Sequence, residues 1–215
     1  MDRIIHELNT YNTIRLREKE GKGQSRIITG YAILFNTSSA PLWTEGDKKV
    51  YEQIAPEAIT KELLDTQDIK MTMFHDRQLI LARSNKGQGT LSYNVDSKGV
   101  SFEFEAPKTV DGDKAIELVK RGDLQGCSFA FSTSYNDGAY VDLITTDKEI
   151  IYKVRKIIDV YDFTLAADPA YPDTNVNLRE ALKNLQKEED NKKRELEKVS
   201  LTVKEMRKKA HQSII

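Results

Sequence analysis

The chain has 215 residues, and its 33 Lys or Arg against 34 Asp or Glu exclude a globally basic nucleic-acid-binding protein. Its apolar runs are shorter than the roughly 18–20 residues that span a bilayer, and its start lacks the apolar stretch of a signal peptide. The single cysteine, Cys127, excludes an internal disulfide framework. We therefore expect a cytoplasmic protein without a cofactor and without a membrane or nucleic-acid partner.

Composition divides the chain into three zones. Residues 1–25 are charged and poor in aromatic residues, and they predict a flexible leader. Residues 26–178 contain nearly all the aromatic residues and all five prolines, so this zone is expected to be the folded domain. Residues 179–215 predict a charged helical tail whose apolar residues alternate in steps of four and three. A coiled coil and a solvated helix both fit, since polar residues interrupt the apolar stripe.

Strand-forming segments dominate the middle zone. Runs of β-branched and aromatic residues predict strands at 26–34, 68–74, 89–95, 100–106, 127–134, 139–146, 149–158 and 160–166. One helix is predicted to begin at Pro56, and a second to run from Asp113, as N-cap, to Gly122, as C-terminal stop. The pattern favours a β-rich α+β fold, an antiparallel β-barrel or sandwich flanked by a few helices.

Histidine is scarce, with three in the chain, so His75 draws attention at the end of the predicted strand 68–74. Period-two alternation places it on the face shared by Ile69, Met71 and Met73. A buried histidine with a hydrogen-bonded partner is one interpretation. The other is a general base, because imidazole titrates near neutral pH.

The strand at 127–134 has two different faces. Alternation places Cys127 with Phe129 and Phe131, where a thiol is protonated and inert. Ser128 lies on the opposite face, with Ala130 and Ser132, which is small and polar enough to line a cleft. A serine at such a position is ordinarily a plain strand residue, and the alternative is a nucleophile.

Asp162 lies in an otherwise apolar strand, on the face that it shares with Thr164. A surface-facing aspartate is the ordinary explanation, because a buried carboxylate without a partner is costly. If Asp162 faces the same cleft as His75 and Ser128, the three form an acid–base–nucleophile array.

Six segments in a fixed order suggest a family. They are GYAILFN (30–36), YEQIAPEAI (51–59), MFHDRQLILARS (73–84), GTLSYNVDSKGVSFEFEAPKT (89–109), ELVKRGDLQGCSFAFS (117–132) and DVYDFTLAADPAYPDTNV (159–176). On these segments the chain resembles the caudovirus prohead serine proteases, the phage enzymes that mature procapsids. The serine segment and PAYPDT carry the most specific part of the resemblance.

The resemblance implies that His75 and Ser128 match the histidine and the serine of the family. Asp162 stands where the family usually has glutamate, and it keeps the carboxylate with one methylene less. A fold similar to the herpesvirus assemblin proteases is also implied, namely a β-barrel with flanking helices. Backbone N–H groups near Ser128 are the expected oxyanion hole, with Arg83 as a further candidate.

For function, the resemblance implies a serine endopeptidase that acts inside the procapsid in the host cytoplasm. Its substrate is expected to be the scaffolding protein or the scaffold-like extension of the major capsid protein, and also the protease itself. A homo-oligomer is expected by analogy with assemblins. The tail is expected to bind helical scaffold segments and so to concentrate the protease in the shell.

Three other functions fit parts of the sequence. A non-catalytic capsid assembly or scaffolding protein keeps the fold and acts through its C-terminal helix. A cysteine hydrolase uses Cys127 with His75, which the strand alternation disfavours. A metal hydrolase is disfavoured because no two of the three histidines have ligand spacing on one element.

Overall fold

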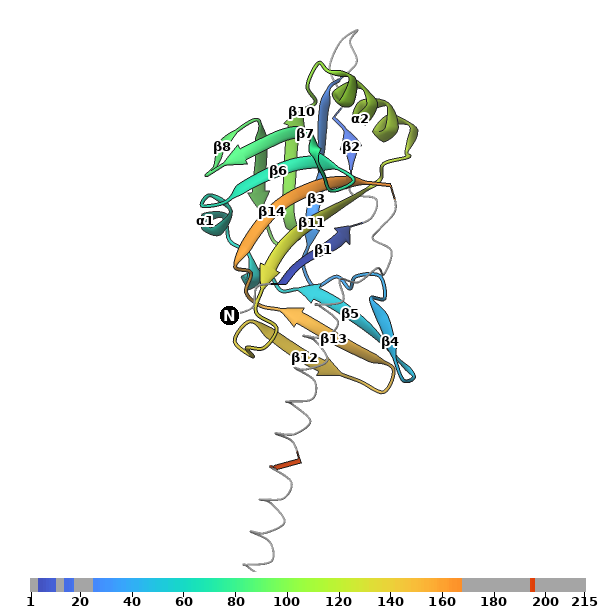
Figure 1. Ribbon diagram of the computed structural model, residues 1–215, viewed down its shortest axis with the longest axis vertical. Helices are drawn as coiled ribbons and strands as arrows, with labels where there is room; N and C mark the ends of the chain where they lie inside the picture. Colours follow the sequence, from blue (N-terminus) through green and yellow to red (C-terminus); the bar gives the residue numbers. More distant parts are fainter. Residues whose placement is uncertain (1–3, 11–13, 18–24, 168–193, 196–215) are drawn as a thin grey trace, which may run out of the picture.

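A computed structural model describes residues 4–10, 14–17, 25–167 and 194–195, and strands make up most of its regular structure (Figure 1). The strands are β1 (Ile4–Thr10), β2 (Arg15–Leu16), β3 (Ile27–Leu34), β4 (Trp43–Glu45), β5 (Lys48–Ile54), β6 (Asp68–Met73), β7 (Asp76–Asn85), β8 (Gln88–Gly89), β9 (Leu91–Val95), β10 (Gly99–Glu105), β11 (Gly126–Thr133), β12 (Val141–Thr145), β13 (Glu149–Val154) and β14 (Asp159–Ala166). The helical segments are η1 (Pro56–Ala58), α1 (Lys61–Leu64) and α2 (Val110–Arg121). The predicted β-rich α+β class is therefore confirmed.

The strands form three sheets. One has six strands in the order β1-β11-β14-β6-β7-β8, and two have four strands, in the orders β2-β3-β10-β9 and β12-β13-β5-β4. Among the described residues no sheet closes on itself, so the expected barrel is not found. The pairing is mostly antiparallel, as the pattern predicts, with two exceptions: β14 runs parallel to β6 and β13 parallel to β5. A crossover through other elements separates the members of each parallel pair.

The main core lies between the six-stranded sheet and the sheet that contains β3. β3 lies against β1 and β11, and β9 lies against β7. The residues that fill the core from both sheets are fully or almost fully buried, and they include Ile28, Ile33, Ile69, Met71, Met73, Phe102, Phe104, Phe129, Phe131, Phe163 and Leu165. Burying each such side chain contributes roughly 1.5–3 kcal/mol, which makes the six-stranded sheet a rigid platform.

Two of the helix predictions are corrected in detail. The segment from Pro56 divides into the 3-10 turn η1 and the short helix α1, whose N-cap is Thr60. Helix α2 begins earlier than predicted, because Thr109, and not Asp113, is its N-cap and accepts a hydrogen bond from the Gly112 N–H at 3.2 Å. Gly122 ends α2 as predicted, with a left-handed φ of 81° that glycine adopts without strain.

The expected leader over residues 1–25 contains two strands. β1 pairs along its whole length with β11, and β2 pairs with β3. Backbone hydrogen bonds of this kind need no aromatic residues, so composition gives no sign of them. These strands belong to the folded sheets, which corrects the predicted leader.

The predicted tail over residues 179–215 lies outside the described residues, apart from Arg194 and Glu195. Within the part of the chain that the structure describes, no helix has the length and apolar character needed to cross a membrane.

Candidate active site

Three neighbouring strands bring the candidate residues onto one face of the six-stranded sheet. Ser128 of β11 lies opposite Thr164 of β14, and Thr164 lies opposite Thr72 of β6. Two residues further along, Asp162 of β14 lies opposite Ala130 of β11. Directly opposed residues place their side chains on the same face, so the serine, the aspartate and both threonines project to the same side.

The opposite face of β11 belongs to the core. The Phe129 and Phe131 rings stack with their centroids 5.0 Å apart, and Cys127 is fully buried beside them. Burial raises the pKa of the Cys127 thiol. A protonated thiol in the core is a poor nucleophile, as the alternation predicts.

The other face of β11 is closed as well. Ser128, Ala130 and Ser132 are 1%, 3% and 0% exposed, whereas the sequence suggests that they line a cleft. The hairpin between β6 and β7 contributes to this burial, because it places the His75 imidazole within hydrogen-bond distance of the Ser128 hydroxyl.

His75 lies in a tight turn and not on the strand. Met73 pairs with Asp76, which leaves Phe74 and His75 as the two turn residues, with φ values of 56° and 54°. A two-residue hairpin turn of this left-handed kind ordinarily contains Gly or Asn, so two larger residues indicate local strain that the surroundings must offset. The expectation that His75 shares the face of Met73 is therefore wrong, because the turn ends the alternation.

Hydrogen bonds to β14 anchor this turn. The Phe74 N–H donates to the Leu165 carbonyl at 3.2 Å, and the His75 N–H donates to the Thr164 Oγ1 at 2.9 Å. The same Thr164 Oγ1 accepts a hydrogen bond from the Thr72 hydroxyl at 2.8 Å. Both threonines are fully buried. The strand that carries Asp162 therefore also fixes the backbone of His75.

The three candidate residues form a continuous hydrogen-bonded chain. His75 Nε2 lies 2.8 Å from Ser128 Oγ, and His75 Nδ1 lies 2.9 Å from Asp162 Oδ1. The side chains of His75 and Asp162 are 20% and 6% exposed, so the carboxylate is shielded and has the imidazole as its partner. In the tautomer with the proton on Nδ1, the Nδ1–H donates a hydrogen bond to the Asp162 carboxylate. Nε2 then accepts the hydrogen bond from the Ser128 hydroxyl and can take its proton.

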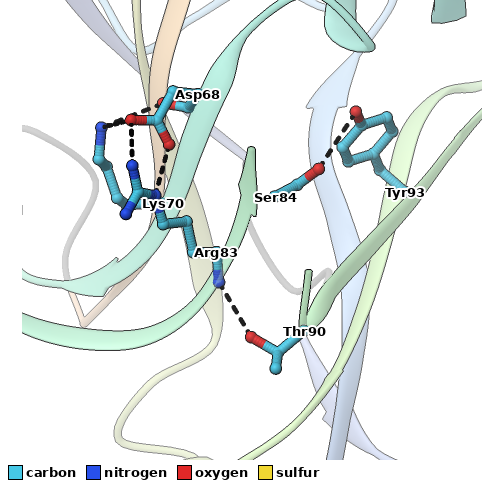
Figure 2. A network of polar contacts seen from close by, with 6 residues as sticks. All are labelled: Asp68, Lys70, Arg83, Ser84, Thr90 and Tyr93. Carbon is cyan, nitrogen blue, oxygen red and sulfur yellow. Dashed lines mark hydrogen bonds and ion pairs between the residues drawn. The ribbon is translucent and has the colours of Figure 1, made fainter. Parts of the chain in front are cut away.

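Arg83 is held away from this chain. It lies on β7, and its guanidinium donates to both carboxylate oxygens of Asp68, at 2.6 and 2.7 Å (Figure 2). Lys70 donates to the same carboxylate at 2.7 Å, and the two cations hold the pKa of Asp68 well below its usual range. Three strand spacings of about 4.8 Å, roughly 14 Å in all, separate β7 from β11. This position argues against Arg83 as an oxyanion donor.

Sequence reasoning misses Thr72 and the anchoring role of Thr164. For Thr164 the sequence gives one signal, the strand face that it shares with Asp162. For Thr72 it gives none, because the parallel pairing of β6 with β14 has no local signature in the sequence. Among the described residues no cluster of three or more His, Cys, Asp or Glu side chains is placed to hold a metal ion.

An apolar surface lies on the same hairpin. Phe74 and Ile80 are 48% and 47% exposed, and they are among the few large apolar side chains that the described part of the chain exposes. Phe74 precedes His75, and Ile80 lies opposite Thr72. This pair of side chains, Phe74 and Ile80, is called the hairpin patch below.

Comparison with known proteins gives a family match. The sequence model of the caudovirus prohead serine proteases matches residues 12–188, which include all three candidate residues. Among solved structures, the capsid assembly protease gp21 of bacteriophage T4 aligns with a TM-score of 0.38 at 12% identity, over 76% of this chain and 97% of that chain. No curated protein matches the sequence.

Proposed function

Because the chain belongs to the caudovirus prohead serine protease family, we propose that Ser128 is its nucleophile, His75 its general base and Asp162 the carboxylate that orients His75. Membership makes the chain a bacteriophage serine protease of capsid maturation. The observation that carries the assignment of residues is the chain of two hydrogen bonds, 2.8 Å from Ser128 to His75 and 2.9 Å from His75 to Asp162.

The geometry supports the following mechanism. Ser128 Oγ attacks the carbonyl carbon of the scissile peptide bond while its proton passes to His75 Nε2. Asp162 stabilises the imidazolium that forms, and Nε2 then protonates the leaving amine as the C–N bond breaks. Water attacks the resulting acyl-enzyme and gives a proton to Nε2. The C–O bond to Ser128 breaks, and the proton returns to the serine oxygen.

We assign Thr164 a positioning role in this mechanism. Its hydroxyl accepts the hydrogen bond from the His75 N–H and lies two residues from Asp162, so one strand sets the spacing between the imidazole and the carboxylate. A shift of about 1 Å in such a constellation is sufficient to lower a rate by roughly 10².

We propose a polypeptide substrate, namely the scaffolding protein or the scaffold-like extension of the major capsid protein, cleaved inside the assembling capsid in the host cytoplasm. The hairpin patch supports this substrate class, because exposed apolar side chains on the hairpin that carries His75 favour an apolar side chain of a bound peptide. The protease itself is proposed as a further substrate.

The remaining proposals concern the organisation of the chain. We propose that residues 26–178 contain the protease machinery, with β1 and β2 added to its sheets. The tail over 179–215 is proposed to bind helical scaffold segments, and self-association of the protease is proposed with it.

Co-expression with the phage's own major capsid protein tests the proposal. We expect fragments of the capsid protein, or of the protease, in the wild type and in Cys127→Ala, and intact chains alone in Ser128→Ala. Intact-mass measurement gives the cleavage sites from the fragment masses. Cleavage that persists in Ser128→Ala would exclude the proposed nucleophile. Intact chains in every sample would favour the non-catalytic scaffolding function.

A further inference from the structure

The strand that carries Ser128 has a neighbour on each side. β14 pairs with one edge of β11, and β1 pairs with the other, from Ile4 opposite Thr133 to Thr10 opposite Cys127. In this register Asn9 lies opposite Ser128. β1 is the end strand of its sheet, so it covers the one edge of β11 that the sheet would otherwise leave open (Figure 1).

β1 differs from the other strands around Ser128 in its position along the chain. The family match begins at residue 12, so β1 lies before the matched region, whereas β6, β11 and β14 lie within it. β2, which follows β1 in the chain, pairs with β3 in a different sheet. The strand pairing of β2 is therefore with β3 and not with β1 or β11.

An extended peptide binds to a sheet by adding a strand at an open edge. The other end of the six-stranded sheet is the two-residue strand β8, and β14, β6 and β7 separate it from β11. The edge beside Ser128 is thus the position from which a peptide backbone reaches the nucleophile. With β1 paired there, that edge of β11 is occupied.

We propose that β1 occupies the binding edge of the substrate, and that an extended polypeptide displaces β1 to pair antiparallel with β11 beside Ser128. The inference rests on the proposed function, because it takes Ser128 as the nucleophile. The edge of β11 is closed to a substrate while β1 is paired with it, and it is open once β1 leaves. The fraction of open molecules sets the apparent activity toward peptides.

The first measurement is the rate at which a fluorophosphonate probe modifies Ser128. We compare the full chain with a chain that lacks residues 1–11 and with full-length Leu8→Pro, because proline fixes φ at about −65°, away from the extended value of a strand, and so weakens pairing at the residue opposite Phe129. We expect both changes to raise the rate about tenfold or more. Rates equal to or below that of the full chain would overturn the proposal, as would failure of both variants to fold.

The second measurement restores the strand as a separate molecule. A synthetic peptide with the sequence of residues 1–11 is expected to inhibit the truncated chain competitively against a peptide substrate. The same peptide with Leu8→Pro is the matched control, and it is expected to inhibit about tenfold more weakly or not at all. Equal inhibition by the two peptides, or none by either, would contradict the proposed pairing. Absence of a Ser128 adduct in every chain would instead refute the proposed function.

Discussion

The backbone N–H of His75 donates a hydrogen bond to the hydroxyl of Thr164, 2.9 Å away, and this bond joins the strained hairpin turn to the strand that carries Asp162. Thr164 also accepts a hydrogen bond from Thr72 on the parallel strand β6. The imidazole is therefore positioned from two sides, by its backbone through Thr164 and by its ring through Asp162.

Replacement of the threonine tests this anchoring. Thr164→Val keeps the shape but removes the hydroxyl that accepts the hydrogen bond from the His75 N–H, so we expect kcat to fall by about 10- to 100-fold. The free energy of unfolding should fall by about 1–3 kcal/mol. Thr164→Ser retains the hydroxyl and is expected to keep most of the activity. Peptide-cleavage kinetics and urea unfolding measure the two effects, and equal loss of kcat in both variants would refute the anchoring role.

The carboxylate is tested by a pair of substitutions at one position. Asp162→Asn keeps the size of the side chain but favours the wrong imidazole tautomer, and we expect kcat to fall by about 10⁴. Asp162→Glu keeps the charge with one methylene more, as in the glutamate that the family resemblance implies, and we expect a smaller loss. If the two variants lose activity equally, the charge of Asp162 does not act on His75.

The hairpin patch is tested by its contribution to substrate binding. Phe74→Asn removes the ring but suits the left-handed backbone of the turn, and Ile80→Ser removes a side chain from the neighbouring strand. We expect each to raise KM for a capsid-derived peptide by about 3- to 10-fold with kcat nearly unchanged. Ile144→Ser, on β12 of the third sheet, removes a comparably exposed side chain and is the matched control. A KM change that is the same in the control would show that the patch is not a substrate contact.

A buried carboxyl links stability to pH. Glu52 is fully buried on β5, where its side chain accepts a hydrogen bond from Tyr135, just beyond β11. Burial raises the pKa of Glu52 from its usual value of 4.5 to about 8. Between these values the folded protein holds a proton that the unfolded chain releases, so the free energy of unfolding falls as pH rises through this window.

The slope of that fall has an upper limit of about 1.4 kcal/mol per pH unit. Glu52→Gln removes the titrating group, so we expect a flatter dependence between pH 5 and pH 8 than in the wild type. Urea unfolding at several pH values measures both slopes. Identical slopes would show that Glu52 does not titrate in this range.

The proposed tail function is tested by deletion of residues 180–215. We expect the shortened protease to cleave a capsid-derived peptide at a rate within about twofold of the full chain, because the candidate catalytic residues all precede the deletion. Its incorporation into procapsids, measured by mass spectrometry of purified particles, should be lost. Normal incorporation of the shortened chain would exclude a role for the tail in encapsidation.

Local signals account for the part of the fold that the sequence predicts. The β-branched and aromatic runs locate β3, β6, β9, β10, β11, β12, β13 and β14, because their side chains face a core. β7 is missed because its first three residues are polar and exposed. β1 is missed because an edge strand is held by backbone hydrogen bonds, which leave no mark in the composition. The parallel pairing of β14 with β6 depends on contacts distant in sequence, which no local pattern encodes.

Local sequence patterns also predict only part of the candidate site. Alternation separates Ser128 from the buried Cys127 and puts Asp162 on one face with Thr164, and the structure agrees on both points. Alternation fails at His75, because the left-handed turn at Phe74 and His75 moves the imidazole out of the strand pattern. Periodicity alone does not distinguish these three residues from the other polar ones, whereas the family resemblance does.

The most direct test of the proposed mechanism is the identity of the residue that a fluorophosphonate probe modifies, determined by tandem mass spectrometry of the digested full chain. We expect one adduct, on Ser128, whose formation is lost in His75→Ala because no base remains to accept the serine proton. An adduct on another residue, no adduct in either the full chain or the chain that lacks residues 1–11, or modification of Ser128 in His75→Ala at the wild-type rate would contradict the proposed mechanism.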